Sequence, residues 1–259
     1  MDETIVHAYG IISADDAPNQ FPPGIADTTV SVFGVDRLAA VVSLLPVEGF
    51  GAADWERNAT NVVWLERVAR QHHAVLQHVA ATTAVVPLRL PSLYGNLKSL
   101  ADTLRSAAEP LERDLRRIEG KVEWSVKVYR SAEAQSPAVS APSSSGRDYL
   151  LARSRDLSAR SSAQEQLRAR VREIHETLGQ ICAEYLRNQP QDAVLSGRRE
   201  QMLLNGAYLV GKADQARFLE LVQEIADDSS TKGLSVEVSG PWPAYNFTGE
   251  AETAREALT

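Results

Sequence analysis

A segment that cannot build a hydrophobic core divides this chain in two. Residues 131–147 read SAEAQSPAVSAPSSSGR, in which Ser, Ala and Pro dominate. This composition is typical of a flexible linker, because it offers little apolar surface to bury. We therefore expect an N-terminal domain over residues 1–130 and a C-terminal domain over residues 148–247, followed by a tail over residues 248–259.

The residues before the linker predict strands and helices in the order β, β, β, α, β, α, β. Apolar residues at spacings of three and four indicate helices near 54–81, with a break near Asn58–Thr60, and near 96–118. The apolar face of the first helical pattern is formed by Val62, Leu65, Ala69, His72, Leu76 and Val79. The last strand, 121–130, alternates cleanly and carries Trp124 on its apolar face. We expect an α+β domain with helices on one face of an open sheet, a modified ferredoxin-like plan with an added hairpin strand.

After the linker, a long helix is predicted from about 148 to 189, a stretch that Gly179 alone interrupts. Its apolar residues fall on heptad a and d positions, so we expect a coiled-coil-like helix. The seam residues are Leu157, Gln164, Leu167, Val171, Ile174, Leu178, Ile181 and Tyr185. Arg153 and Arg160 interrupt the early seam, so a packing partner is expected on its later part. Two strands, a helix over 214–227 and a closing strand over 234–239 complete a smaller α+β domain.

An aromatic strip, GPWPAYNF over residues 240–247, follows the closing strand directly. Proline fixes φ and lacks a backbone donor, so the strip is neither a helix nor a central strand. Its three aromatic residues, Trp242, Tyr245 and Phe247, have little reason to lie in a solvated tail. The strip is either a lid over a core or a docking strip for a partner. Its place after the closing strand favours a lid on the sheet or on the base of the long helix.

Composition sets broad limits on what the chain does. Hydrophobic residues make up 44% of the 259 residues and charged residues 24%, which is ordinary for a globular protein. The formal net charge of −7 gives a nucleic-acid partner no general attraction. The single cysteine, Cys182, excludes an internal disulfide and is interpreted as a small hydrophobe. The acidic N-terminus and the lack of a membrane-length apolar run predict a cytoplasmic protein with no membrane partner.

The motifs of common enzyme classes are missing from the sequence. It has no HExxH, no cysteine cluster, no phosphate-binding glycine loop and no GxSxG, so we expect no catalytic residues, cofactor or metal. His72 lies on the apolar stripe of its helix and is interpreted as a hydrogen-bonded core histidine. Arg89, at a strand end between prolines, is interpreted as a structural ion pair or a partner contact. Nothing composes a catalytic constellation.

Four landmarks nevertheless stand in a fixed order along nearly the whole chain, from about residue 7 to residue 247. They are Trp64-Leu-Glu with His72-His-Ala-Val75, Val85-Val-Pro87-Leu-Arg89-Leu, Glu123-Trp124-Ser-Val-Lys127, and Gly240-Pro-Trp-Pro-Ala-Tyr-Asn-Phe247. Together with Tyr9-Gly-Ile-Ile and Val41-Val-Ser43, this ordered set resembles the gas vesicle protein GvpF/GvpL family. After Arg89 the family usually continues Phe-Gly-Thr, whereas this chain has Leu90-Pro91-Ser92, so the turn there is built differently.

The resemblance implies an accessory protein of gas vesicle assembly, found in the cytoplasm or at the vesicle. It implies two α+β domains with coiled-coil-like helices, no enzymatic activity, and contacts with the small hydrophobic shell protein and other accessory proteins. It does not choose between the GvpF and GvpL paralogues. Arg89, Trp124, Trp242, Tyr245 and Phe247 are the candidate structural or partner contacts.

Two other functions stay open at this point. A small-molecule-binding or enzymatic ferredoxin-like domain would use His72 and Arg89 in an exposed cavity, whereas a buried His72 bonded to backbone would count against it. A self-associating structural protein would pair copies of the chain through the 157–185 helix. It would show a concentration-dependent oligomer in solution.

Overall fold

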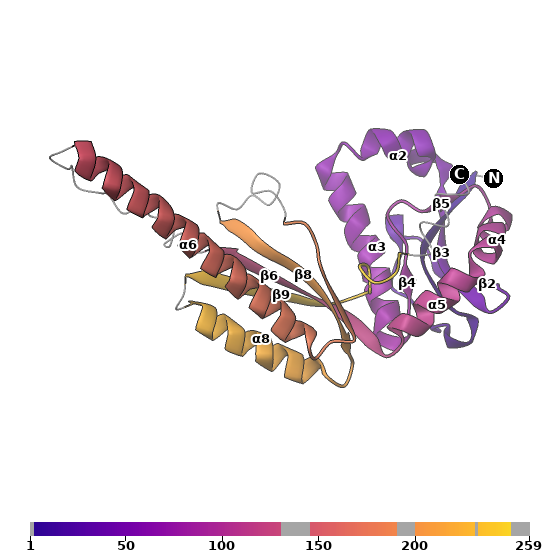
Figure 1. Cartoon of the computed structure of the whole chain (residues 1–259). Coiled ribbons are helices and arrows are strands. Elements are labelled where there is room, and N and C mark those ends of the chain that lie inside the picture. Colours follow the sequence, from indigo (N-terminus) through magenta and orange to yellow (C-terminus); the bar gives the residue numbers. More distant parts are fainter. Residues whose placement is uncertain (1–2, 131–145, 191–199, 231–232, 250–259) are drawn as a thin grey trace. The chain divides into compact units, whose positions relative to one another are not determined.

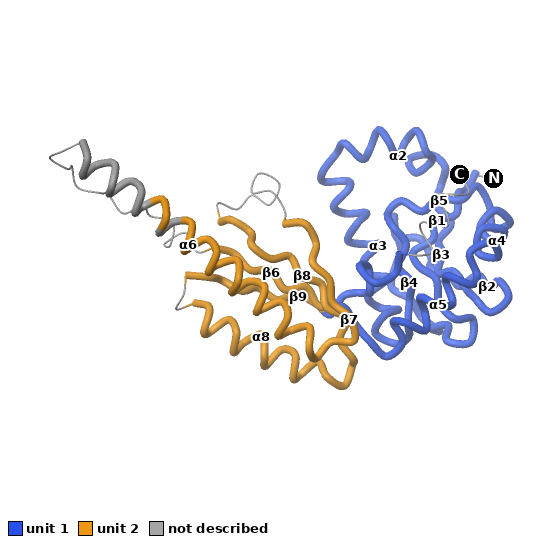
Figure 2. Tube along the Cα trace, in the orientation of Figure 1, with its two compact units in different colours: residues 1–123, 241–259 blue, residues 124–240 orange. Residues whose placement is uncertain are grey.

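The computed structural model describes residues 3–130, 146–190, 200–230 and 233–249, with only the backbone of residues 146–156, 159 and 160 (Figure 1). Two compact units emerge from the contacts within the chain (Figure 2). Unit 1 comprises residues 1–123 and 241–259, and unit 2 comprises residues 124–240. These divisions differ from the predicted domains, because residues 124–130 belong to unit 2 and the chain returns to unit 1 at Pro241. The linker predicted over 131–147 lies outside the described residues except for Gly146 and Arg147, which begin helix α6.

Unit 1 is built around a five-stranded sheet with the order β2-β3-β1-β4, in which β5 also pairs with β1. Its paired strands are antiparallel, and a bulge between Ala8 and Gly10 shifts the register of β1 against β3. The elements are β1 (Thr4–Ser13), η1 (Ala14–Asp16), η2 (Ile25–Asp27), β2 (Val30–Val35), β3 (Leu38–Pro46), α1 (Val47–Phe50), α2 (Ala52–Asn58), α3 (Val62–Thr82), β4 (Val86–Pro87), β5 (Leu93–Tyr94), α4 (Leu97–Ser106) and α5 (Ala108–Ile118).

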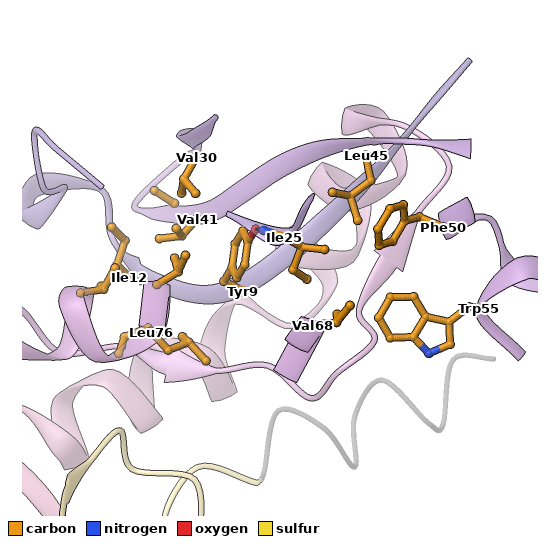
Figure 3. Packing of buried hydrophobic residues seen from close by; sticks show 14 residues of the cluster. Tyr9, Ile12, Ile25, Val30, Val41, Leu45, Phe50, Trp55, Val68 and Leu76 are labelled. Carbon is orange, nitrogen blue, oxygen red and sulfur yellow. Dashed lines mark hydrogen bonds between the residues drawn. The ribbon is translucent and has the colours of Figure 1, made fainter. Parts of the chain in front are cut away.

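Helices cover both faces of this sheet, not one face as predicted. Tyr9 and Ile12 of β1 join the core under α3, where Val68 and Leu76 are also buried (Figure 3). The neighbouring Ile11 lies against Leu104 of α4 and against α5, because adjacent strand residues point to opposite faces. The two-sided covering explains why nearly all of β1 is buried.

The helix boundaries in unit 1 follow local capping. The predicted break between two helices is confirmed, since α2 ends at Asn58 and α3 begins at Val62. The Asn61 side chain accepts hydrogen bonds from the backbone N–H groups of Val63 and Trp64 at 3.1 and 3.2 Å, a standard N-cap. The helix predicted over 96–118 is two helices, α4 and α5, which meet at Ala107.

Unit 2 has a four-stranded sheet with the order β7-β8-β6-β9, and β7 pairs antiparallel with β8. Its described elements are β6 (Lys121–Arg130), α6 (Gly146–Gly179), β7 (Glu184–Arg187), β8 (Gln201–Gly211), α8 (Gln215–Ser230) and β9 (Leu234–Trp242). Helices α6 and α8 lie side by side on the sheet (Figure 1). An ion pair between Arg170 and Asp228 joins them.

Two predictions about these elements are wrong. The strand 121–130 was expected to close the N-terminal sheet, but as β6 it lies between β8 and β9 in the sheet of unit 2. The long helix was expected to reach residue 189, but α6 ends at Gly179 and Tyr185 lies in β7. A Cβ on Gly179 would lie 2.5 Å from the Tyr185 ring, so the close packing of this turn requires glycine.

The described part of the predicted seam is buried only toward the end of α6. Val171, Ile174 and Leu178 are buried in unit 2, whereas Leu157 has 59% of its surface exposed. The later seam therefore packs within its own chain, as expected. Arg153 and Arg160 belong to the helix residues whose side chains are not described.

Candidate partner-binding surface

A pair of histidines lies buried between β1 and α3. His7 Nε2 and His72 Nδ1 are 3.0 Å apart, and His72 Nε2 lies 3.1 Å from the carbonyl oxygen of Leu88. The Tyr9 ring stacks on His72 with a centroid distance of 5.4 Å. A carbonyl oxygen only accepts, so His72 Nε2 carries the proton and its Nδ1 accepts from His7. This direction leaves His7 Nδ1 as the acceptor without a partner among the described groups.

Burial keeps both rings neutral. It lowers the pKa of His7 from 6.5 to about 3, with a smaller contribution from the neighbouring His72. Burial likewise lowers the pKa of His72 to about 4, against the opposing effect of the Leu88 carbonyl. The interpretation of His72 as a hydrogen-bonded core residue is therefore correct. A buried, backbone-bonded His72 counts against the alternative in which it works in an exposed cavity.

The side chain of Arg89 is exposed, unlike the buried pair of histidines. It belongs to the turn that differs from the family pattern. In that turn the Leu90–Pro91 peptide bond is cis, and Ser92 Oγ donates to the Arg89 carbonyl at 2.8 Å. The carbonyl of Ser92 accepts from the Ala8 backbone N–H at 3.0 Å, which fixes the turn to β1.

The aromatic strip packs on α3 of unit 1. Trp242 lies 5.1 Å from the His73 ring, and the Tyr245 ring stacks on the same histidine at 6.2 Å. Tyr245 Oη is 3.3 Å from His73 Nδ1. Phe247 has only 2% of its surface exposed, whereas Tyr245 has 39%. The strip therefore packs on α3, whereas a lid on the sheet or on the base of the long helix was expected; its first residues, Gly240–Trp242, are the end of β9.

Glu123 anchors the strip through two hydrogen bonds to Asn246. Its carboxylate accepts from the backbone N–H of Asn246 at 2.8 Å and from Asn246 Nδ2 at 2.5 Å. Glu123 is buried, and desolvation raises the pKa of its carboxyl group even though both hydrogen bonds act in the opposite direction. Directly after the strip, Thr248 donates from Oγ1 to the Ala244 carbonyl at 3.0 Å. The predicted tail beyond residue 249 lies outside the described residues.

Trp124 is a core residue of unit 2. Its ring lies 6.3 Å from Phe218 of α8, and Phe218 lies 5.6 Å from Tyr208 of β8. His175 Nδ1 is 2.7 Å from Tyr208 Oη, so this aromatic group also joins α6 to the sheet. Only 7% of Trp124 is exposed, which leaves it a packing role.

Cys182 follows α6 and donates from Sγ to the Leu178 carbonyl at 3.1 Å. Burial raises its pKa to about 12, so the sulfur is a protonated thiol at neutral pH. A thiol in this state is a poor nucleophile. Its interpretation as a small hydrophobe fits this environment.

Two features of the described residues bear on a possible active site in unit 1, namely its cavity and the placement of metal-ligating side chains. A narrow cavity lies between Ile11, Leu88, Leu104 and Leu111, and neither His72 nor Arg89 lines it. Within the described ranges, no group of three or more His, Cys, Asp or Glu side chains is placed to hold a metal ion. No helix in the described part of the chain is long and apolar enough to cross a membrane.

The first turn of α3 presents apolar side chains to solvent. Val62 and Val63 have 75% and 78% of their surface exposed, and Leu65 has 36%. We call these three residues the α3 patch. Trp64, between them in sequence, instead packs against Trp55 and Phe50, with ring centroids 5.0 and 5.9 Å away.

Sequence periodicity missed this patch. It assigned Val62 and Leu65 to the buried stripe of the helix, but the buried residues of α3 begin at Val68. The available signal was the Asn61 cap, which places Val62 and Val63 in the first turn, where a helix has no preceding turn for cover.

Two antiparallel sheets with helices packed on them place the chain among mixed α+β proteins. The crystal structure of gas vesicle protein GvpF from Anabaena sp. PCC7120 superimposes with a TM-score of 0.67 at 18% identity, covering 95% of this chain and 96% of that one. GvpF from Microcystis aeruginosa gives a TM-score of 0.67 at 17% identity, covering 94% and 98%. At these identities the likeness establishes the fold.

Sequence comparison establishes the family. The chain belongs to the family described as gas vesicle synthesis protein GvpL/GvpF, whose model matches residues 5–249. Gas vesicle protein L of a Streptomyces species is 35% identical over 220 residues, which cover 83% of this chain and 81% of that protein. Gas vesicle protein F2 of Halobacterium salinarum is 29% identical over 248 residues, which cover 95% and 93%. The resemblance drawn from the four landmarks is confirmed.

Proposed function

We propose that this chain is a non-enzymatic accessory protein of gas vesicle assembly that binds the small hydrophobic shell protein and other vesicle proteins. Its membership of the GvpL/GvpF family supports a role in the gas vesicle. We place it in the cytoplasm and at the forming vesicle. The proposed role is to cover apolar surface of the shell protein before polymerisation, since exposed apolar surface of that kind promotes aggregation.

The observation that carries the contact is the exposure of Val62 and Val63. A folded protein gains nothing in stability from two adjacent valines in water, whereas a partner gains by covering them. Burying both would contribute roughly 2–4 kcal/mol, at about 25 cal/mol per Å² of apolar surface. We assign this contact to the shell protein because that partner is apolar.

The proposal is tested by co-expressing the chain with the shell protein. Co-purification of the two proteins, together with loss of vesicles in a strain that lacks the chain, would support it. Normal vesicles in the deletion strain and no association between the two proteins would refute it.

A second candidate function rests on Leu157, which is 59% exposed on α6. Two copies of the chain could pair through this early part of the predicted seam, since Val171, Ile174 and Leu178 are already buried. Light scattering across a range of protein concentrations tests this directly. A wild-type dimer that Leu157→Ser converts to a monomer would support self-association, and a monomer at every concentration would refute it.

For the fold, we propose that unit 2 is the ferredoxin-like domain of the chain. Its elements follow the order β6, α6, β7, β8, α8, β9, and its sheet order is β7-β8-β6-β9. The β-α-β-β-α-β order is the one that defines the ferredoxin-like plan. Unit 1, with its added strands, would then be the modified domain.

A further inference from the structure

An arginine-lined cavity opens in unit 2 between α6 and the start of β8. Its volume is about 340 Å³, which is within the usual range of ligand pockets. Four arginines line it: Arg130 from β6, Arg168 and Arg172 from α6, and Arg187 from β7. None of the described residues that line the cavity is acidic, although the chain as a whole carries a net charge of −7.

The arginines of this cavity differ from their neighbour Arg170 on the same helix. Arg170 pairs with Glu173 and with Asp228, and these interactions raise its pKa further. Arg168 and Arg172 lie four residues apart, on one face of α6, and both are exposed. Like charges at this spacing destabilise a helix by about 0.2–0.5 kcal/mol. A bound anion between the two guanidinium groups would offset this repulsion.

The floor of the cavity is apolar. Val171 and Met202 are 3% and 7% exposed, and Leu167, Leu203 and Pro190 add further apolar surface. Arg187 is held in place at one side, where its Nη2 donates to the Leu203 carbonyl at 2.8 Å. A guanidinium has five N–H donors, so others stay available to a ligand. The site combines one arginine held by a backbone hydrogen bond, three further arginines and an apolar base.

From this arrangement we propose that the cavity binds an acidic, partly apolar peptide segment of a partner protein. Guanidinium groups match carboxylates by bidentate hydrogen bonding, and the apolar floor takes a Leu or Val side chain of the same segment. A nucleic acid fits less well, because none of the described residues that line the cavity is aromatic and could stack a base, and the net charge repels a polyanion. This site goes beyond the proposed contact of the shell protein with the α3 patch.

The test uses the full chain and a short fluorescein-labelled peptide in which Glu and Leu alternate, followed by fluorescence anisotropy. Arg168→Gln with Arg172→Gln is expected to weaken binding about 10- to 100-fold, since hydrogen bonds to charged groups are strong. Rising salt weakens the wild-type complex as well. The matched control, Lys212→Gln with Arg217→Gln, removes two exposed cations from the same unit and leaves affinity unchanged.

Two further arms make the outcome decisive. The charge-reversed variant, Arg168→Glu with Arg172→Glu, should lose the Glu peptide and gain a peptide in which Lys and Leu alternate. Equal affinity of wild type for a Gln version of the peptide would overturn the proposal. So would binding of a single-stranded oligonucleotide, without binding of the Glu peptide, that depends on Arg168 and Arg172.

Discussion

His7 and His72 form a direct ring-to-ring hydrogen bond, 3.0 Å long, between the central strand and the main helix of unit 1. Sixty-five positions separate them in sequence. The bond, with the carbonyl of Leu88 at its other end, connects β1, α3 and the segment after β4. Both histidines are neutral in the folded chain and take up protons in the unfolded chain at acidic pH. Folding is therefore linked to pH.

The first prediction concerns acid stability. Both folded pKa values lie below the ordinary 6.5, at about 3 and about 4, so the unfolded chain binds more protons once the pH falls below 6.5. The free energy of unfolding should therefore fall between pH 6.5 and pH 4, by up to about 1.4 kcal/mol per pH unit for each histidine. Urea denaturation across this range measures the slope.

Matched variants separate this histidine pair from other titrating groups. His72→Gln removes one titrating group and keeps a donor for Leu88, so the slope should decrease by about 1.4 kcal/mol per pH unit. Gln77→Ala, at an exposed and non-titrating position of the same helix, should leave the slope unchanged. Equal slopes in wild type and His72→Gln would show that the pair does not carry the pH dependence.

A second prediction concerns Gly24. A Cβ there would lie 2.4 Å from Tyr9 Oη and 2.7 Å from Ser43 Oγ. Tyr9 donates to Ser43 at 3.1 Å and accepts from the Ile25 N–H at 2.9 Å. Gly24→Ala should destabilise the protein by about 2–3 kcal/mol, through overpacking and lost hydrogen bonds.

The control for Gly24 is Gly34→Ala, because a Cβ at Gly34 meets nothing within 4 Å. This variant should be as stable as wild type or slightly more stable, since alanine loses less backbone entropy on folding. Thermal and urea denaturation measure both. The same loss of stability in the two variants would contradict the steric argument.

A third prediction concerns the aromatic strip. Phe247→Ala should lower the free energy of unfolding by about 3–5 kcal/mol, as for other buried aromatics. Tyr245→Ala should cost much less, because 39% of Tyr245 is already exposed. If the two substitutions have equal effects on denaturation, the strip is not anchored through Phe247.

A fourth prediction concerns Glu123 and Asn246. Glu123→Ala removes the acceptor of both Asn246 hydrogen bonds and should free the strip, which limited proteolysis after β9 would detect. Glu119→Ala, at an exposed position before β6, should be cleaved by the protease at the same rate as wild type.

Burial raises the folded pKa of Glu123, so the folded state holds this proton more tightly. Its ionisation lowers stability as the pH rises above the unfolded value, opposite in sign to the histidines.

Sequence patterns identified most local elements but not their partners. The alternation of 121–130 indicates a strand, yet alternation is the same whichever sheet receives it, so β6 was placed with the wrong neighbours. The apolar stripe indicated that His72 is buried, whereas its partner His7 is distant in sequence and no pattern connects the two. Gly179 carried a usable helix-end signal, but the heptad spacing through Tyr185 outweighed it.

The same holds for the candidate surface, where sequence patterns predicted local features but not their contacts. The strip was predicted to be a lid from its prolines and aromatics, but its contact with His73 of α3 needed the fold. Val62 is exposed although the periodicity predicted it to be buried. Periodicity identifies the apolar face of a helix, but not how much of its length other elements cover.

The central claim is that the α3 patch holds the hydrophobic shell protein before it polymerises. The most direct measurement is the fraction of shell protein that stays in the supernatant when it is co-expressed with variants of this chain. Val62→Ser with Val63→Ser should send the shell protein to the pellet without unfolding the chain. Val238→Ser, at a valine that is 40% exposed on β9, should keep it in solution as wild type does. Equal amounts of shell protein in solution with the α3 patch variant and with wild type would contradict the claim.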